Sequence, residues 1–484
     1  MSFTSLPFIF LFLPIACILF YTIPYKQVLL ALISAVFLFL LDQNTFYILL
    51  PLLAIGYLFH MFTYKYHGRS HDGTIGFKIW MTAAVTLTVL PLLVCKYTDF
   101  FARSLGIEIS FRSRIIVPIG ISFFTFRQIM VIVDSCKKNI NMNPIEYISY
   151  VLFFPQITSG PIERPQDFLD WVRSEEFGAV RYEVIAGGIV RVVTGMAKKI
   201  LIANTLSNIA DVCFAERTGI NSTLALFGIL GYSLQIYFDF SGYSDMAIGI
   251  ANILGFRSCE NFDSPYRART IGEFWKRWHL SLTKFFTYYI YIPLGGNRKG
   301  LVRTCLNIMI IFLISGLWHG ADWKFILWGA VYGLILVIER IVKMDPEKFS
   351  ALPGRIAGRV VTMIVVSLLW TLFRVDTIGG ACSIIREFFR FDFHPVTQEL
   401  MAATYIPEID LAIQKFGVSD QIYAVWPYVI VGFSLILSQL PVNSRRLCEK
   451  KWYLKKTGFI LLILMAILST LSFSSNTAFI YWNF

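Results

Sequence analysis

The sequence predicts an all-α polytopic membrane protein. Of its 484 residues, 56% are hydrophobic and only 15% are charged, and the mean hydropathy is +0.62. Soluble globular domains average about 45–50% apolar and about 25% charged residues, so one compact core could not hide this much apolar surface. The apolar residues also gather in repeated stretches of the length that a membrane helix needs, which is about 20 residues.

The apolar stretches predict about ten to fourteen membrane segments. Several of them are too short to cross the bilayer alone, since the working range for a spanning helix is about 17–25 residues. Residues 28–41 and 243–256 are therefore expected to be buried, tilted or re-entrant. The stretches are 6–22, 28–41, 46–63, 79–95, 115–133, 145–160, 184–203, 222–240, 243–256, 305–321, 324–342, 358–375, 425–440 and 457–474.

The charges of the connecting segments predict the topology. Residues 257–303 carry nine Lys and Arg against three acids, and residues 441–456 are also basic, which places both segments in the cytoplasm by the positive-inside rule. Residues 376–424 are poor in Lys and Arg and are expected outside it. With no internal repeat or soluble domain visible, the prediction is one integral membrane domain over residues 1–484 with an extracytoplasmic insertion near 376–424.

Composition excludes several other partners. The net charge of +12 is explained by basic cytoplasmic loops. The predicted partner is therefore the lipid bilayer, and nucleic acid is not expected to bind. The eight Cys are scattered singly with no C-x-x-C pair, which indicates neither a zinc site nor a disulfide framework. His67 and His71 have i, i+4 spacing, but no third ligand is evident, and no metal site is predicted.

His319 lies between two apolar runs, in the string LISGLWHGADWKFILW of residues 313–328. Ionisable side chains inside membrane segments are costly and mark candidate sites. The residues alone are compatible with a packed histidine that bonds to a neighbouring helix. They are equally compatible with a base or proton carrier, because the ordinary pKa of imidazole lies near physiological pH.

His279 belongs to a second candidate element, residues 272–292. At helical spacing Trp275, Trp278 and Phe286 share one side, and Lys276, Arg277 and Lys284 lie away from it. This pattern predicts one amphipathic helix at the membrane interface, with its apolar face in the bilayer and its basic face toward phosphates. Such a helix usually serves as an anchor, so spacing alone favours anchoring over catalysis for His279.

A polar cluster interrupts the apolar sequence at residues 235–245, QIYFDFSGYSD. Asp239 and Asp245 are accompanied by Gly242 and several hydroxyl groups. Hydrogen bonds between helices with small residues at their contact are ordinary membrane packing. The cluster therefore predicts a structural seam between helices rather than a catalytic site.

Several strings resemble the membrane-bound O-acyltransferase (MBOAT) family, and within it the bacterial alginate O-acetyltransferase branch. They are FFPQITSGPIERPQDF (153–168), FDFSGYSDMAIGI (238–250), FWKRWHLSLTKFFTYYIYIPLGGNR (274–298), SGLWHGADWKFILWG (315–329) and FIYWNF (479–484). The resemblance follows nearly the whole chain in order. It implies a bundle of tilted and re-entrant helices around a transmembrane passage, a principal catalytic histidine at His319 and an upstream partner at His279.

The resemblance also implies a reaction. It is transfer of an acetyl group from a cytoplasmic thioester, acetyl-CoA or another pantetheine thioester, to an extracytoplasmic polysaccharide hydroxyl or to an extracytoplasmic acetyl-handling protein. The donor binds transiently and no permanently bound cofactor is expected. His319 would accept the proton of the attacking hydroxyl, and His279 would orient the donor or complete proton transfer. The expected location is the bacterial cytoplasmic (inner) membrane, which the chain would cross several times.

Two other functions fit the same sequence. One is transfer of D-alanine to teichoic acid, with a carrier protein that supplies the pantetheine thioester. The other is a polysaccharide transporter or export channel, which would share the spans, the buried polar residues and the broken helices. Internal repeats would favour the transporter, and none is visible.

Overall fold

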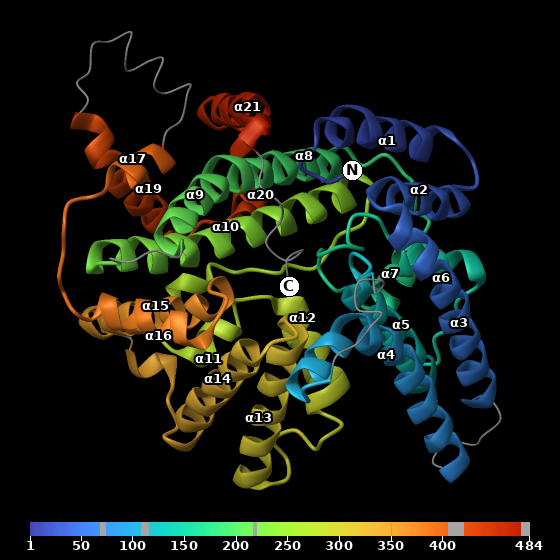
Figure 1. The fold of residues 1–484 in the computed structure, drawn as a ribbon. Helices are drawn as coiled ribbons and strands as arrows, with labels where there is room; N and C mark the ends of the chain where they lie inside the picture. Colours follow the sequence, from blue (N-terminus) through green and yellow to red (C-terminus); the bar gives the residue numbers. More distant parts are fainter. Residues whose placement is uncertain (68–73, 108–115, 216–219, 350, 405–420, 476–484) are drawn as a thin grey trace. The chain divides into compact units, whose positions relative to one another are not determined.

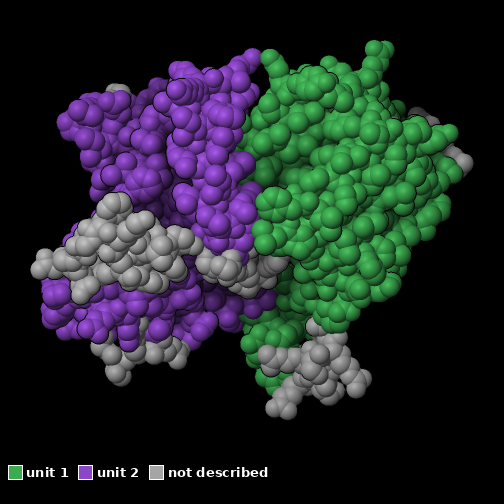
Figure 2. Space-filling view, turned by 90° about the horizontal axis from the view of Figure 1, so that it is seen from above, with its two compact units in different colours: residues 1–192, 243–260 green, residues 193–242, 261–484 purple. Residues whose placement is uncertain are grey.

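The computed structural model describes residues 1–67, 74–107, 116–215, 220–349, 351–404 and 421–475, which form helices and no strand (Figure 1). The chain divides into two compact units, coloured separately in Figure 2. Unit 1 comprises Met1–Val192 and Tyr243–Glu260, and unit 2 comprises Val193–Gly242 and Asn261–Phe484. This division does not decide how many domains fold independently, so the single membrane domain stays a prediction.

Unit 1 is built mainly from the N-terminal helices. Helix α3 packs against α4 and α5, and α2 packs against α6. The close approach of α3 and α5 depends on Gly56, where an added Cβ would lie 2.4 Å from Nε2 of Gln128. The helices are α1 (Leu13–Thr22), α2 (Lys26–Leu41), α3 (Gln43–His67), α4 (Ile75–Ser104), α5 (Ile121–Lys137), α6 (Pro144–Val151) and α7 (Pro165–Val172).

Unit 2 contains the C-terminal helices and shares α8 (Tyr182–Met196) and α10 (Ser222–Ile253) with unit 1. Its most extensive helix pair is α13 with α14. The unit comprises η3 (Ala197–Ala203), α9 (Asn204–Phe214), η4 (Pro265–Arg267), α11 (Ile271–Trp275), α12 (Leu280–Phe286), η5 (Thr287–Tyr291), α13 (Gly300–His319), α14 (Trp323–Ile341), α15 (Leu352–Arg374), α16 (Ile378–Phe388), α17 (Gln398–Ala403), α19 (Gln421–Gln439), α20 (Ser444–Glu449) and α21 (Lys456–Leu471).

The predicted membrane character is confirmed. Five of the described helices are long and apolar enough to cross a bilayer, namely Gln43–Tyr66, Ile75–Ser104, Ser222–Ile253, Gly300–His319 and Leu352–Arg374. Several helices also turn large apolar side chains outward, such as Phe459, Leu464 and Leu468 on α21. Exposed apolar side chains along a helix suit contact with lipid.

The stretches 222–240 and 243–256 are not separate segments, because α10 runs unbroken through Gly242. In unit 2, a Cβ on Gly242 would lie 2.8 Å from the carbonyl oxygen of Gly195. The glycine therefore permits close packing of two backbones and does not end the helix. From sequence the same glycine resembles a helix break, which explains why two segments are predicted there.

The predicted polar seam is present as buried ion pairs. In unit 2, Lys199 Nζ lies 2.5 Å from Asp239 Oδ1, and in unit 1 the guanidinium of Arg191 lies 2.8 Å from both Asp245 and Glu260. The side chains of Lys199 and Asp239 are each 2% exposed. Buried charges are tolerated when each has a partner of opposite sign, so these pairs account for the aspartates in structural terms.

Candidate active site

The single amphipathic helix predicted over residues 272–292 is wrong. Helix α11 ends at Trp275, α12 begins at Leu280, and His279 between them has a left-handed backbone with φ of 45°. The break is stabilised by the segment that begins at Asn261. The backbone N–H of Leu280 donates to the Asn261 carbonyl at 3.0 Å, and the Arg277 carbonyl accepts from the backbone N–H of Asp263 at 3.0 Å.

Much of the apolar side of residues 272–292 is buried inside unit 2, whereas the prediction places that side in the bilayer. Trp278 is 1% exposed, and Leu282 and Phe286 are each 5% exposed. Phe274 stacks on Trp278 with ring centroids 5.4 Å apart, and Trp278 contacts Trp370 of α15. The amphipathic pattern thus reports burial inside unit 2, while Lys276 and Lys284 stay exposed as predicted.

His279 is buried, and a polar partner and an aromatic partner hold its ring. Its Nδ1 lies 3.1 Å from Oδ1 of Asn261, and its ring centroid lies 4.7 Å from that of Phe240 in an edge-to-face arrangement. Asn261 Oδ1 also accepts hydrogen bonds from the Ser281 hydroxyl at 2.8 Å and the Ser281 backbone at 3.3 Å. Asn261 is therefore a site residue that the sequence interpretation missed.

His319 is the last residue of α13 and is enclosed by aromatic rings. Its ring centroid lies 5.1 Å from those of Trp328 and Phe373, and 4.8 Å from that of Trp318. The position of α13 is set by its close contact with α14. A Cβ on Gly316 would lie 2.3 Å from the carbonyl oxygen of Phe325, so only glycine allows the two helices to approach this closely.

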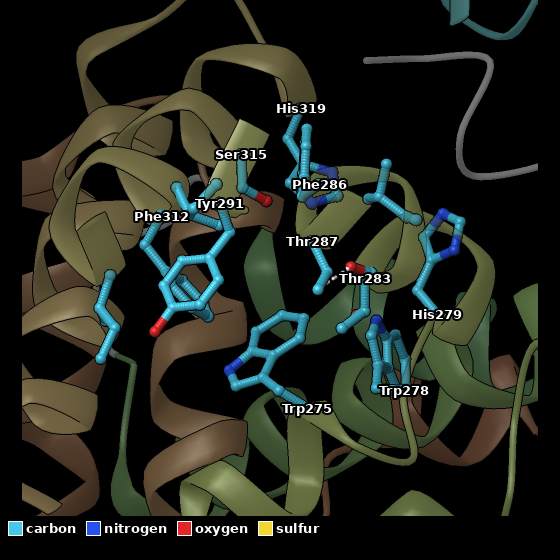
Figure 3. Close-up of a pocket in the computed structure, with 13 residues that line it drawn as sticks. Trp275, Trp278, His279, Thr283, Phe286, Thr287, Tyr291, Phe312, Ser315 and His319 are labelled. Carbon is cyan, nitrogen blue, oxygen red and sulfur yellow. Dashed lines mark hydrogen bonds between the residues drawn. The ribbon is translucent and has the colours of Figure 1, made fainter. Parts of the chain in front are cut away.

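Both predicted histidines line one pocket of about 230 Å³ in unit 2. In the view of Figure 3 the two histidines lie on one side of this pocket, and Tyr291 and Phe312 lie on the other. The ring of Trp318 contacts both histidines, at 6.1 Å from His279 and 4.8 Å from His319. The structure thus brings together two residues that are 40 positions apart in the sequence.

The pocket wall is mostly apolar, with a few polar groups. The hydroxyl residues are Thr283, Thr287 and Ser315. The indole Nε1 of Trp275 is buried and has no hydrogen-bond partner among the described residues. The full lining is Trp275, Trp278, His279, Leu282, Thr283, Phe286, Thr287, Tyr291, Ile308, Ile311, Phe312, Ser315 and His319. An apolar pocket with a few convergent polar groups is typical of a site for a small organic ligand.

Comparison with known proteins identifies the family. The model of the membrane-bound O-acyltransferase family matches residues 109–373, which include both histidines. A probable alginate O-acetylase of Azotobacter vinelandii is 36% identical over 400 residues, which cover 81% of this chain and 78% of that protein. A probable alginate O-acetylase of Pseudomonas putida is 32% identical over 503 residues and all of both chains. A peptidoglycan O-acetyltransferase of Helicobacter pylori is 30% identical, covering 84% and 82%.

These matches agree with the helical, apolar structure and with a pocket suited to a small organic ligand. They favour acyl transfer over a transporter or export channel, because the family and these relatives are named as acyltransferases. Transfer of D-alanine stays open, since teichoic acid D-alanyltransferases also match. The chain belongs to the membrane-bound O-acyltransferase family and is a multi-pass membrane O-acyltransferase.

Proposed function

We propose that this protein moves an acetyl group from acetyl-CoA on the cytoplasmic side of the bacterial inner membrane to an extracytoplasmic polysaccharide hydroxyl, directly or through an acetyl-handling partner. The observation that carries the proposal is that His279 and His319 line the same pocket, although the chain has only six histidines. Relatives named as alginate and peptidoglycan O-acetyltransferases support an acetyl group and a polysaccharide acceptor.

The reaction forms one ester bond and breaks one thioester bond. His319 accepts the proton of the acceptor hydroxyl while the oxygen attacks the acetyl carbonyl carbon. The carbon–sulfur bond then breaks, and the proton passes to the leaving thiolate, so that the products are the acetyl ester and the free thiol. His279 lies on the same pocket and orients the thioester or completes the proton transfer. Base assistance of this kind contributes about 10²–10⁴-fold to the rate.

The pocket suits a reaction within the membrane. A free acetate ion would be costly to move through hydrocarbon, whereas an acetyl group that passes from one ester to another never carries that charge. The donor would enter from the basic cytoplasmic side and the acceptor from the opposite side. The hydroxyl groups of Thr283 and Ser315 line the pocket and could hydrogen-bond the amides of a pantetheine arm. The Thr287 hydroxyl donates to the Thr283 carbonyl at 2.7 Å and could only accept a hydrogen bond from such an arm.

The test is replacement of His319 by Ala and by Gln, with acetylation of the cell-surface polysaccharide measured by mass spectrometry. We expect a loss of about 10²–10⁴-fold in both variants. His394→Gln is the matched control, since this histidine is more than half exposed and lies outside the pocket. Acetylation at the wild-type level in His319→Ala, with membrane insertion confirmed by immunoblot, would overturn the proposal.

A second measurement identifies the donor. The purified protein, supplied with acetyl-CoA labelled in its acetyl group, should transfer label to an oligosaccharide acceptor or release labelled acetate. D-Alanyl transfer would require an aminoacylated carrier protein instead. Transfer from such a carrier, with none from acetyl-CoA, would contradict the proposed donor while leaving acyl transfer intact.

A further inference from the structure

Four arginines from separate parts of unit 2 converge beside the segment that precedes His279. Arg267 belongs to η4, Arg277 to the turn between α11 and α12, Arg359 to α15 and Arg446 to α20. We call these four residues the arginine cluster. No sequence stretch contains more than two of them. The cluster therefore forms only when the chain folds and is not visible in local composition.

Asp263 pairs with two members of the arginine cluster. Its carboxylate is 3.6 Å from Arg277 Nη1 and 3.5 Å from Arg446 Nη2, and it accepts a hydrogen bond from Asn443 at 3.1 Å. The backbone of α15 packs against the same segment, because a Cβ on Gly358 would lie 2.9 Å from the carbonyl oxygen of Arg269. Arg359 is the next residue on α15, and its charge acts on Arg267 of η4.

Positive charge exceeds negative charge at this place. Among the residues that the structure describes, Asp263 and Glu273 are the carboxylates paired with these arginines, and Glu273 is also shared with Arg269. Burial, and then the charges of Arg359, Arg277 and Arg446, lower the pKa of Arg267, and Asp263 opposes this only in part. The charge of Arg267 is therefore only partly compensated, and an added anion would stabilise it.

Two donor atoms of the cluster point to such an anion. The Nε atoms of Arg267 and Arg359 are buried and have no hydrogen-bond partner within the described ranges. Buried donors without a partner carry a desolvation cost that a ligand can remove. The outer parts of the cluster remain accessible, since the side chains of Arg277 and Arg446 are 27% and 39% exposed.

The identity of the anion follows from the residues around it. Guanidinium groups match the geometry of phosphate oxygens and bind them through paired hydrogen bonds. Arg277 is two residues before His279, so their Cα atoms are within about 7.6 Å by chain geometry. A phosphate held at the cluster would thus belong to a molecule whose other end can reach the pocket that His279 lines.

We propose that the arginine cluster binds the phosphate groups of the pantetheine thioester donor and so places its thioester end in the pocket. This inference rests on the proposed function, which supplies the donor. The same chemistry would also recognise the phosphate of an anionic lipid headgroup, and the experiment separates the two sources.

The experiment measures binding of radiolabelled CoA and of radiolabelled pantetheine, which lacks the phosphates, to purified protein in detergent. In the double variant Arg267→Gln/Arg359→Gln we expect CoA to bind at least about tenfold more weakly, because each hydrogen bond to a charged group is worth on the order of a tenfold change in affinity. Pantetheine should bind equally to both proteins. The control Arg355→Gln/Arg445→Gln removes the same charge at exposed positions of α15 and α20 and should leave CoA binding unchanged.

Three results would overturn the inference. They are unchanged CoA binding in the double variant, an equal loss for CoA and pantetheine, and an equal loss in the control. Repetition in phosphatidylcholine vesicles with and without phosphatidylglycerol tests the lipid source. Loss of phosphatidylglycerol binding in the double variant, with CoA binding unchanged, would assign the cluster to lipid headgroups. The proposed function would fail by a different result, namely that the wild-type protein binds CoA but transfers no acetyl group.

Discussion

Asn261 determines which nitrogen of His279 carries the proton. The backbone N–H of Ser281 donates to Asn261 Oδ1, and so does the Ser281 hydroxyl. A backbone N–H needs an acceptor and the NH2 group of an amide is a donor, so this atom is the amide carbonyl oxygen. His279 Nδ1, 3.1 Å from the same oxygen, must then be the protonated nitrogen of a neutral ring. Nε2 is left as the basic nitrogen, which is the form that can accept a proton.

The first prediction concerns this positioning role. Asn261→Ala removes the acceptor that holds the His279 tautomer, and we expect kcat for acetyl transfer to fall by up to about 10²-fold, the lower end of what acid–base assistance contributes. Asn261→Asp keeps an acceptor oxygen and should retain more activity than Asn261→Ala. Steady-state kinetics of acetyl transfer by the purified proteins would measure both.

Ser281→Ala is the matched control for this comparison. It removes only the hydroxyl donor to Asn261 and leaves the contact between Asn261 and His279 in place. We expect it to lose less activity than Asn261→Ala. If Ala and Asp at position 261 were equally inactive, the tautomer argument would be wrong and Asn261 would have a packing role.

The second prediction uses the left-handed backbone of His279. Side chains other than glycine rarely adopt this conformation, asparagine tolerates it best, and a β-branched residue is a genuine outlier there. We therefore expect His279→Val to be less stable than His279→Asn by about 1–3 kcal/mol. Both variants should lose acetyl transfer. Thermal unfolding in detergent separates the two effects, and equal unfolding temperatures would contradict the backbone argument.

The fold class could be predicted from the sequence because the length of an apolar run matches the thickness of the bilayer that a helix must cross. Helix α14 begins and ends within one residue of the predicted stretch 324–342. Helices α13 and α15 end within two residues of the predicted stretches 305–321 and 358–375 but begin five and six residues earlier. The interruption of the helix at His279 could not be predicted. It depends on the hydrogen bonds from Leu280 to Asn261 and from Asp263 to Arg277. The residues of each pair are far apart in the sequence, and helical periodicity reports only on near neighbours.

The candidate site was predicted in part. His319 and His279 stand out because imidazoles are rare in this chain, and family resemblance raised them above packing residues. Asn261 could not be singled out in this way, because a single asparagine near a basic loop commonly serves in a turn or a helix cap. The partners of the polar seam were also missed. Lys199 and Arg191 lie in an apolar stretch whose charges become interpretable only when Asp239 and Asp245 are placed opposite them.

The third prediction tests whether the contact of α13 with α14 positions His319. Gly316→Ala would place a Cβ 2.3 Å from the Phe325 carbonyl oxygen, and backbone cannot yield as a side chain can. The helices must move apart, and His319 lies less than one turn from the contact. We expect at least about a tenfold loss of acetyl transfer, since misplacement by about 1 Å can cost 10²-fold.

Gly432→Ala on α19 is the control, because an added Cβ there meets nothing within 4 Å. It should leave acetyl transfer unchanged and could raise helix stability slightly. Full activity in Gly316→Ala, with normal insertion, would show that His319 is positioned by other contacts, such as those with the rings of Trp328 and Phe373.

The fourth prediction concerns the buried pair of Lys199 and Asp239. Removal of one partner leaves the other buried charge without this ion pair, so Asp239→Asn should lower the free energy of unfolding by about 3–5 kcal/mol. Replacement of both by apolar residues, Lys199→Met with Asp239→Leu, should recover much of the loss. Thermal unfolding in detergent gives the comparison. A double variant less stable than Asp239→Asn would show that the pair has a role beyond mutual neutralisation.

The fifth prediction tests the topology on which the direction of transfer depends. Cys382 on α16 is exposed and belongs to the segment predicted outside, whereas Arg445 on α20 is exposed in a segment predicted inside. Each position is tested in a protein that retains only that cysteine, Cys382 itself or Arg445→Cys. A membrane-impermeant maleimide should label Cys382 in intact spheroplasts and should label residue 445 only after permeabilisation. The reverse pattern would place the arginine cluster outside the cytoplasm, where acetyl-CoA is absent, and both the proposed donor route and the phosphate site would fall together.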